Sequence, residues 1–503
     1  MMGHWIISPI VLPAMMGAFI VLFMRHDLVL QRIFSLAATA ILVLITGSLL
    51  VSASHNPPEI YLLGNWPAPF GIVLMLDRVS AMMVFLTALL AVLVQLYAIG
   101  TNWDARGRHF HALFQFQLMG IGGAFLTGDA FNLFVFFEVL LIASYGLMIH
   151  GGGKDRLRAG VQYIAFNLVG SSLFLIALAS IYSVTGTLNI ADLAVKAQVL
   201  PEGDSALFRV AAIMLMLVFA IKGALVPLQF WLPGTYANAP GPVAALFAVM
   251  TKIGAYAMIR FGVMVLPPTT PATGTMIADL LLPAAIVTLA VGAIGVLGAS
   301  TLGRLAAFAA IASMGTAFLA ISAFTPASTA AALYYMVHST FAGAALFLIV
   351  DLVTERRAND GLRRALPPIA QSGLIAGLFM ASAIATAGMP PLSGFLGKLL
   401  VMDALRDQAA LVWTVILVSS FLIVLGFARA GSVVFWKAHG SAPLEPPSHD
   451  RQTLGFVSVF ALLGMLVIMT VFAGPIMNWL EQTAAHLHDP AAYIAANKLP
   501  EVK

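Results

Sequence analysis

The segment that decides the fold is residues 221–233, which read IKGALVPLQFWLP. It lies in a longer apolar run of membrane-spanning length, yet it carries Lys222 near its start and Pro227 at its centre. Proline has no N–H and clashes with the preceding turn, so we expect the helix to break near Pro227. Freed backbone groups survive at membrane depth only inside protein or beside a cavity. The segment therefore predicts a broken membrane helix with a charged residue at the break.

A second segment has the same character. Residues 387–398 read AGMPPLSGFLGK, so that Gly388, Pro390 and Pro391 precede Lys398. One such segment could be an ordinary kink with a lysine that reaches the membrane surface. Two of them lie five predicted helices apart, and a repeated unit of five helices must be inverted in the membrane. The pair therefore indicates the inverted repeats of transporters, whose sites lie at broken helices near the midplane.

The composition explains why charges inside apolar runs are informative. Of 503 residues, 61% are hydrophobic and only 9% are charged, with 25 Lys and Arg against 21 Asp and Glu. Soluble proteins carry about 25% charged residues. This excludes a cytosolic enzyme, a nucleic-acid binder and a disordered scaffold, and it makes the lipid bilayer the main solvent. Without cysteine the chain has no disulfide and no cysteine-held iron–sulfur cluster. We expect no cofactor and no metal site.

We expect an all-α polytopic membrane protein of about fourteen transmembrane helices, because the apolar runs are continuous rather than alternating as in a membrane β-barrel. The least secure boundary separates the fourth helix from the fifth, where only Gly128 and Asp129 intervene. The predicted spans are 5–24, 28–52, 79–99, 112–129, 131–149, 160–184, 206–233, 243–266, 278–298, 304–325, 329–353, 370–403, 411–436 and 453–479.

We predict one membrane domain over residues 1–503. Its parts are helices one to three (1–111), a first repeat of helices four to eight (112–266), an inverted second repeat of helices nine to thirteen (278–436), helix fourteen (453–479) and a polar tail (480–503). The broken helices are the seventh and the twelfth. Asn189–Leu200 could form a short interfacial helix, and 438–452 is a proline-rich loop.

The distribution of basic residues predicts the orientation. Fourteen Lys and Arg residues lie in or beside loops that follow odd-numbered helices, and five lie on the other side. The positive-inside rule then places the odd-numbered loops in the cytoplasm and both termini outside.

Five ionisable residues fall inside the predicted spans near the bilayer centre. They are Glu138, Lys222, Lys252, His338 and Lys398. Each alone could be a structural pair, but three lysines and one glutamate cannot all be neutralised pairwise. A lysine away from water can release its proton, which arginine cannot do, and histidine is a suitable relay. We read the set as a proton path in which Glu138 and Lys222 form a switchable pair.

Other chemistries fit the sequence less well. A transmembrane bis-histidine haem needs two embedded histidines, and only His338 qualifies. No P-loop, GxSxG or HExxH motif is present, and residues 151–154 (GGGK) are read as a cytoplasmic turn. Asp351, Glu355 and Asp403 lie near predicted helix ends, where they could be ion-uptake groups or solvated loop charges.

These residues resemble the antiporter-like subunits shared by respiratory complex I, membrane-bound hydrogenases and Mrp-type multisubunit cation/proton antiporters. The most specific parts are Phe136-Phe137-Glu138, the run from Lys222 to Pro233 with Ala239-Pro240 after it, and Gly388-Met389-Pro390-Pro391 leading to Lys398. The resemblance implies fourteen helices, a modulating pair at Glu138 and Lys222, a central relay at Lys252 and His338, and a terminal proton site at Lys398. Gln229 stands where many relatives carry histidine.

Within that family the chain looks most similar to the D subunits of Mrp-type antiporters, also called the pH-adaptation potassium efflux type. The resemblance implies a bacterial plasma membrane protein that works with other antiporter subunits and moves protons against K⁺ or Na⁺. A proton-pumping subunit of complex I or of a membrane hydrogenase is the alternative. One central complex I homologue typically carries glutamate in place of Lys398, so Lys398 argues against this chain being that particular subunit.

Overall fold

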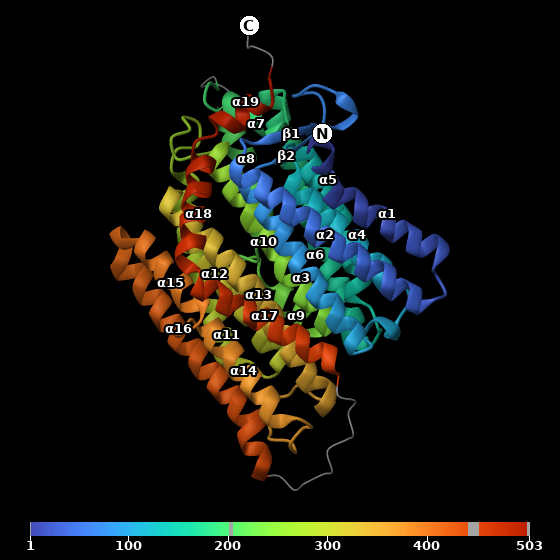
Figure 1. Ribbon diagram of the computed structural model, residues 1–503. Coiled ribbons are helices and arrows are strands. Elements are labelled where there is room, and N and C mark those ends of the chain that lie inside the picture. The colour runs from blue at the N-terminus through green and yellow to red at the C-terminus, as the bar shows by residue number, and fades with distance from the viewer. Residues whose placement is uncertain (1, 201–204, 441–451, 500–503) are drawn as a thin grey trace.

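The computed structural model describes residues 2–200, 205–440 and 452–499, and these are almost entirely helical (Figure 1). A short antiparallel hairpin of β1 (Glu59–Leu62) and β2 (Val73–Leu76) is the one sheet among them. The predicted all-α membrane fold is confirmed. The helices are α1 (Ser8–Phe23), α2 (Leu28–His55), α3 (Arg78–Gly100), α4 (Phe110–Leu126), α5 (Ala130–Met148), α6 (Lys154–Thr185), α7 (Ile190–Lys196), α8 (Ser205–Lys222), α9 (Trp231–Asn238), α10 (Gly241–Met264), α11 (Met276–Gly298), α12 (Leu302–Ile321), α13 (Pro326–Arg357), α14 (Ser372–Ala387), α15 (Ser393–Ala404), α16 (Ala409–Gly431), α17 (Thr453–Val471), α18 (Ala473–His488) and α19 (Ala491–Ala496).

Within the described residues, eleven helices are long and apolar enough to cross a membrane, and α1, α4 and α14 are shorter apolar helices. Each predicted span overlaps one of these helices, and the insecure boundary between the fourth and fifth spans falls between α4 and α5. The number of membrane crossings and the two inverted repeats stay predictions.

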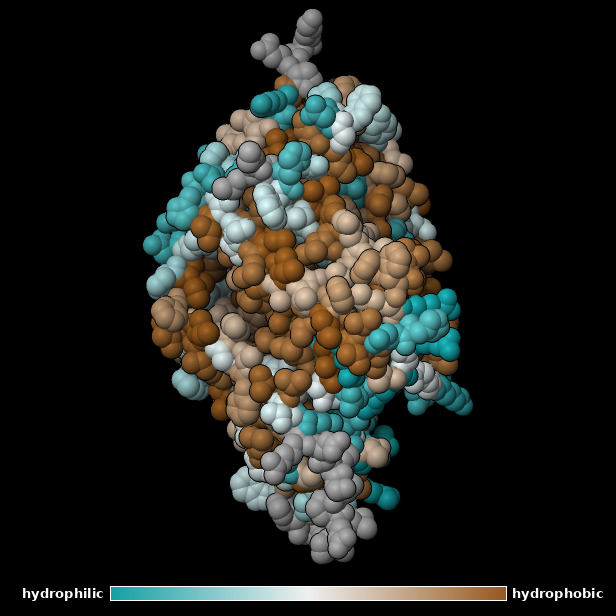
Figure 2. All heavy atoms as spheres, turned by 45° about the vertical axis from the view of Figure 1, so that its right-hand side comes forward, coloured by the Kyte–Doolittle hydropathy of each residue, from teal (hydrophilic) through white to brown (hydrophobic). Residues whose placement is uncertain are grey.

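The outer surface of the bundle matches lipid rather than water. Large apolar side chains such as Leu44 and Val161 are 74% and 67% exposed. Figure 2 shows hydrophobic residues over most of the middle of the face it presents. A hydrophobic patch of this extent is not found on a soluble monomer, so these helices face acyl chains.

The core of the bundle surrounds α10, which is buried along its whole length from Pro242 to Met264. It packs against α3, α8, α12 and α13. A helix that is apolar all round and buried all round cannot be a surface helix. Lys252 is buried about midway along this helix.

The two ends of the described chain meet at one end of the molecule (Figure 1). Asn497 bonds to Asn189 beside α7, and the His4 ring packs on Tyr61 of β1. This common location agrees with an even number of crossings.

The last segment differs from the polar tail expected over 480–503. Helix α18 runs on to His488 and is followed by α19, and the side chains of Leu480, Leu487 and Tyr493 are buried against the bundle. Apolar residues at helical spacing give α18 a docking face, which explains why it packs. The predicted interfacial helix in 189–200 contains α7, and most of the proline-rich loop 438–452 lies outside the described residues.

Candidate proton-translocation site

The first broken helix places Lys222 as the last residue of α8, and α9 begins at Trp231. Pro227 lies in the loop between them. Two of the freed backbone groups find partners inside the protein: the Trp231 indole donates to the Ile221 carbonyl (3.1 Å), and the Val226 amide donates to Thr288 Oγ1 (2.9 Å). Such partners are what a helix break at membrane depth requires.

Lys222 and Glu138 lie close to one another, but no ion pair joins them among the described residues. Lys222 is buried, and its Nζ donates to Asn167 Oδ1 at 2.8 Å. The Ser171 hydroxyl donates to Glu138 Oε1. Asn167 and Ser171 both belong to α6, so one helix holds both members of the expected pair through neutral groups. The pair is open in this conformation.

Lys252 is 2% exposed in the interior of α10. No hydrogen bond or ion pair to its Nζ is found within the described ranges. An ammonium group removed from water without a partner is costly. A structural role would supply a carboxylate or several carbonyls, and neither is present here in the part of the chain that is described.

His338 links the centre of the protein to the second broken helix. Its Nδ1 lies 2.9 Å from Ser393 Oγ, and Ser393 is the first residue of α15. His338 belongs to α13, which packs against both α10, where Lys252 lies, and α15, where Lys398 lies. The helix of His338 therefore contacts the helices of both lysines.

The second break separates α14 from α15, and Gly388, Pro390 and Pro391 lie between them. The close approach of the two half-helices depends on Gly394, because a Cβ there would lie 2.0 Å from the Ala385 carbonyl oxygen and 2.9 Å from His338 Nε2.

Lys398 of α15 bonds across the second break to the end of α14. Its Nζ donates to the carbonyl of Ala387, the last residue of α14, and to Ser420 Oγ of α16, both at 2.8 Å. The carbonyl end of a helix carries partial negative charge and favours a cation. The ammonium group is thus held by a helix end and a hydroxyl, not by a carboxylate.

No two of the five predicted residues bond directly to each other among the described residues. Four contact neutral hydroxyl, amide or carbonyl groups. Neutral partners hold a cation without trapping its proton, so the arrangement is suited to groups that gain and lose protons. The sequence singled out the five charges but missed Asn167, Ser171, Ser393 and Ser420. The spacing of Asn167 and Ser171, four residues apart inside an apolar run, was the available signal.

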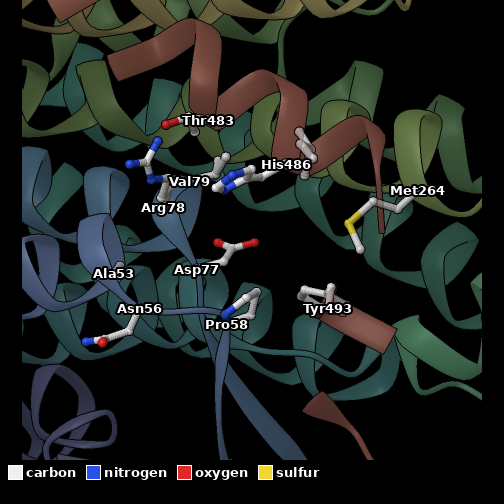
Figure 3. Close-up of a pocket in the computed structure, with 11 residues that line it drawn as sticks. Ala53, Asn56, Pro58, Asp77, Arg78, Val79, Met264, Thr483, His486 and Tyr493 are labelled. Atoms are coloured by element: carbon white, nitrogen blue, oxygen red, sulfur yellow. The ribbon is translucent and has the colours of Figure 1, made fainter. Parts of the chain in front are cut away.

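A buried ion pair at the end of the bundle near the termini was also missed. Arg260 of α10, two turns beyond Lys252, pairs with Asp77, which caps α3 through the Ser80 amide (2.9 Å). Burial alone would raise the pKa of Asp77, but the Arg260 guanidinium and the hydrogen bonds from Ser80 together hold that pKa below its usual range. Figure 3 shows Asp77 facing a small pocket of about 30 Å³ that Tyr493 of α19 also lines. This pair ties α3 to the central helix.

Comparisons with known proteins agree with this architecture. Residues 127–426 match the family described as NADH:quinone oxidoreductase/Mrp antiporter, TM. The chain is 36% identical to a Rhizobium meliloti (strain 1021) protein named as the D subunit of a probable K⁺/H⁺ antiporter, over 98% of this chain and 97% of the relative. It is 37% identical to the Na⁺/H⁺ antiporter D subunit of Bacillus subtilis (strain 168), over 98% of this chain and 99% of the relative.

A solved structure has the same fold. A chain in "Structure of Mrp complex from Dietzia sp. DQ12-45-1b" superposes with a TM-score of 0.89 at 26% identity, and the match covers 99% of both chains.

Proposed function

The chain belongs to the NADH:quinone oxidoreductase/Mrp antiporter membrane family, and on that premise we propose that it is the proton-translocating subunit of a multisubunit K⁺ or Na⁺/proton antiporter. In this proposal the chain is a transporter subunit of a bacterial plasma membrane complex, with both termini on the outer side. The names of the relatives support the cation classes, and their designation as subunits supports membership of a hetero-oligomer.

The observation that carries the proposal is the open pair of Lys222 and Glu138. Asn167 holds the ammonium group and Ser171 holds the carboxylate, so a small shift of α5, α6 or α8 can bring the charges together or apart. When the two charges are together, the Glu138 carboxylate favours a protonated Lys222. Apart, the buried ammonium loses its main electrostatic support and can release its proton.

The released proton would move through Lys252 and His338 to Lys398. The packing of α13, which carries His338, against both α10 and α15 supports this order. The neutral partners of Lys398 allow it to give up the proton at the end of the path. In an antiporter this proton movement drives the efflux of the metal cation.

A proton-pumping subunit of a redox complex is the second candidate, because the matched family description includes NADH:quinone oxidoreductase. The same five residues would serve there. An antiporter complex exchanges K⁺ or Na⁺ for protons without an electron donor, whereas a redox-driven pump moves protons only when it is supplied with one.

The test is cation/proton exchange by the assembled complex in everted membrane vesicles, read as dissipation of an imposed pH gradient when K⁺ or Na⁺ is added. We expect Lys222→Ala and Glu138→Ala to abolish exchange while the complex stays assembled. Lys196→Ala is the matched control, because Lys196 lies at the end of α7 and pairs with Asp192 outside the path. Normal exchange in an assembled Lys222→Ala complex would overturn the proposal.

A further inference from the structure

A large polar vestibule opens at the end of the bundle opposite the termini. Its volume is about 1050 Å³, and it is bordered by the loop after α3, the start of α6, the junction of α9 and α10, and the facing ends of α12 and α13. The loops around it are the arginine-rich ones that the positive-inside rule assigns to the cytoplasm.

Asp351 of α13 lies in the wall of this vestibule and is only 7% exposed. Two neutral donors hold one of its oxygens: the Tyr97 hydroxyl and the Trp103 indole each donate to Oδ2 at 2.8 Å. The other oxygen, Oδ1, has no hydrogen bond or ion pair among the described residues. It faces Gly241, where a Cβ would lie 2.6 Å from it, so the glycine leaves Oδ1 open to the vestibule.

The surroundings of Asp351 favour a proton as its ligand. A bound K⁺ or Na⁺ needs several oxygen ligands, but the groups fixed around this carboxylate are N–H and O–H donors. Arg106, a possible counter-charge, is engaged by Glu355 through two contacts of 2.5 and 2.7 Å. The charged groups that act on Asp351 from the packed elements are Arg106, Arg156, Arg356 and Glu355.

A second, smaller cavity lies beside His338, next to the vestibule along α12 and α13. It has a volume of about 20 Å³, enough for one water molecule, and Ser339 and Gly343 of α13 line it beside His338. On α13, Leu346 lines the small cavity and the next residue, Phe347, lines the vestibule. On α12, Ala306 lines the small cavity and Arg304, two residues earlier, lines the vestibule. The two cavities therefore lie end to end between α12 and α13.

We propose that Asp351 is the proton-loading carboxyl of this vestibule and exchanges protons with His338 along the seam between α12 and α13. The inference rests on the proposed function. A proton from vestibule water binds Oδ1, leaves again to water in the seam, and reaches the imidazole of His338. No bond other than O–H and N–H changes.

Asp351→Asn tests the proposal in the assembled complex, assayed as above. The amide keeps an acceptor for Tyr97 and Trp103 but binds no proton. We expect exchange to fall roughly tenfold or more in medium of about pH 8.5, where bulk protons are scarce, and to recover in part at about pH 6.5. Asp155→Asn is the matched control, since this exposed carboxylate lies at the vestibule rim outside the seam.

A second variant blocks the seam itself. Gly343→Leu fills the cavity beside His338, and we expect it to lower exchange at both pH values. Gly377→Leu is its control, because Gly377 is exposed on α14 with no atom within 4 Å of its Cβ position.

The results separate this proposal from the general function. An unmodified complex that does not exchange cations for protons overturns the proposed function. If the unmodified complex is active, the proposal is overturned by an Asp351→Asn variant with normal exchange at about pH 8.5 or with the same fractional loss at both pH values. If that variant does not assemble, normal exchange by Gly343→Leu overturns it.

Discussion

Asn167 and Ser171 lie one turn apart on the same face of α6 and separate two opposite charges. Asn167 accepts a hydrogen bond from Lys222, and Ser171 donates one to Glu138. A direct ion pair would hold the proton on Lys222. The α6 residues hold the charges near each other without that pairing, so the spacing of α6 from α5 and α8 sets how strongly the pair interacts.

Asn167→Asp should keep Lys222 permanently protonated. The new carboxylate would lie within hydrogen-bond distance of Lys222 Nζ and would hold it protonated, since separating a buried ion pair is strongly unfavourable. We expect cation/proton exchange in vesicles to fall roughly tenfold or more with normal assembly. Asn359→Asp is the control, because Asn359 is an exposed loop residue. Exchange at the normal rate in Asn167→Asp would contradict a switch at Lys222.

Ser393→Ala should interrupt transfer at the second break. It removes the hydroxyl 2.9 Å from His338 Nδ1 and leaves the ring without that partner. We expect a loss of roughly tenfold in exchange rate, with partial recovery in Ser393→Thr, which restores a hydroxyl. Ser172→Ala is the control, because among the described residues the Ser172 hydroxyl bonds only to the Leu168 carbonyl of its own helix, on the exposed face of α6. Equal activity of the Ala and Thr variants would show that the hydroxyl has no part in transfer.

The sequence identified the charged residues of the site because charge is rare inside apolar runs. Their neutral partners could not be identified in the same way. A serine in a membrane helix commonly bonds to its own backbone, as Ser172 does, and the spacing of Ser171 from Asn167 is the one local feature that sets Ser171 apart. The distinction depends on which helix faces which, and Lys222 lies 55 positions from Asn167.

The broken helices were predictable because proline acts locally on its own helix. The packing of α18 and α19 and the pair of Asp77 with Arg260 were not, since that pair joins residues 183 positions apart. Arg260 lies near the end of α10, but only the fold brings α3 alongside α10 at that depth.

Asp77→Ala should destabilise the fold more than removal of both charges. The single change leaves the Arg260 guanidinium, 3% exposed in its side chain, without its carboxylate. Such a change costs about 3–5 kcal/mol, whereas replacing both partners by apolar residues is often neutral. We expect the unfolding temperature of the purified complex to fall most in Asp77→Ala and less in Asp77→Leu with Arg260→Met. Additive effects of the single changes would contradict a coupled pair.

Asp129 gives the fold a pH dependence of the opposite sign to that of a paired carboxylate. It caps α5 through the Asn132 amide at 2.8 Å, and burial raises its pKa from 3.8 to about 6. Between about pH 4 and about pH 6 the folded chain therefore holds a proton that the unfolded chain has lost. Stability from this group is greatest below about pH 4, falls as the pH rises, and stays reduced above about pH 6.

Asp129→Asn should remove this dependence, because the amide oxygen still caps the helix and cannot ionise. We expect the variant to gain unfolding temperature relative to the parent at about pH 7 and to gain less at about pH 4. Asp27→Asn is the matched control, since Asp27 caps α2 through the Leu30 amide but is exposed to solvent. A difference between Asp129→Asn and the parent that is constant with pH would show that the buried carboxyl does not titrate on folding. A loss of stability at about pH 7 would show that the ionised carboxylate is stabilised by contacts beyond its cap.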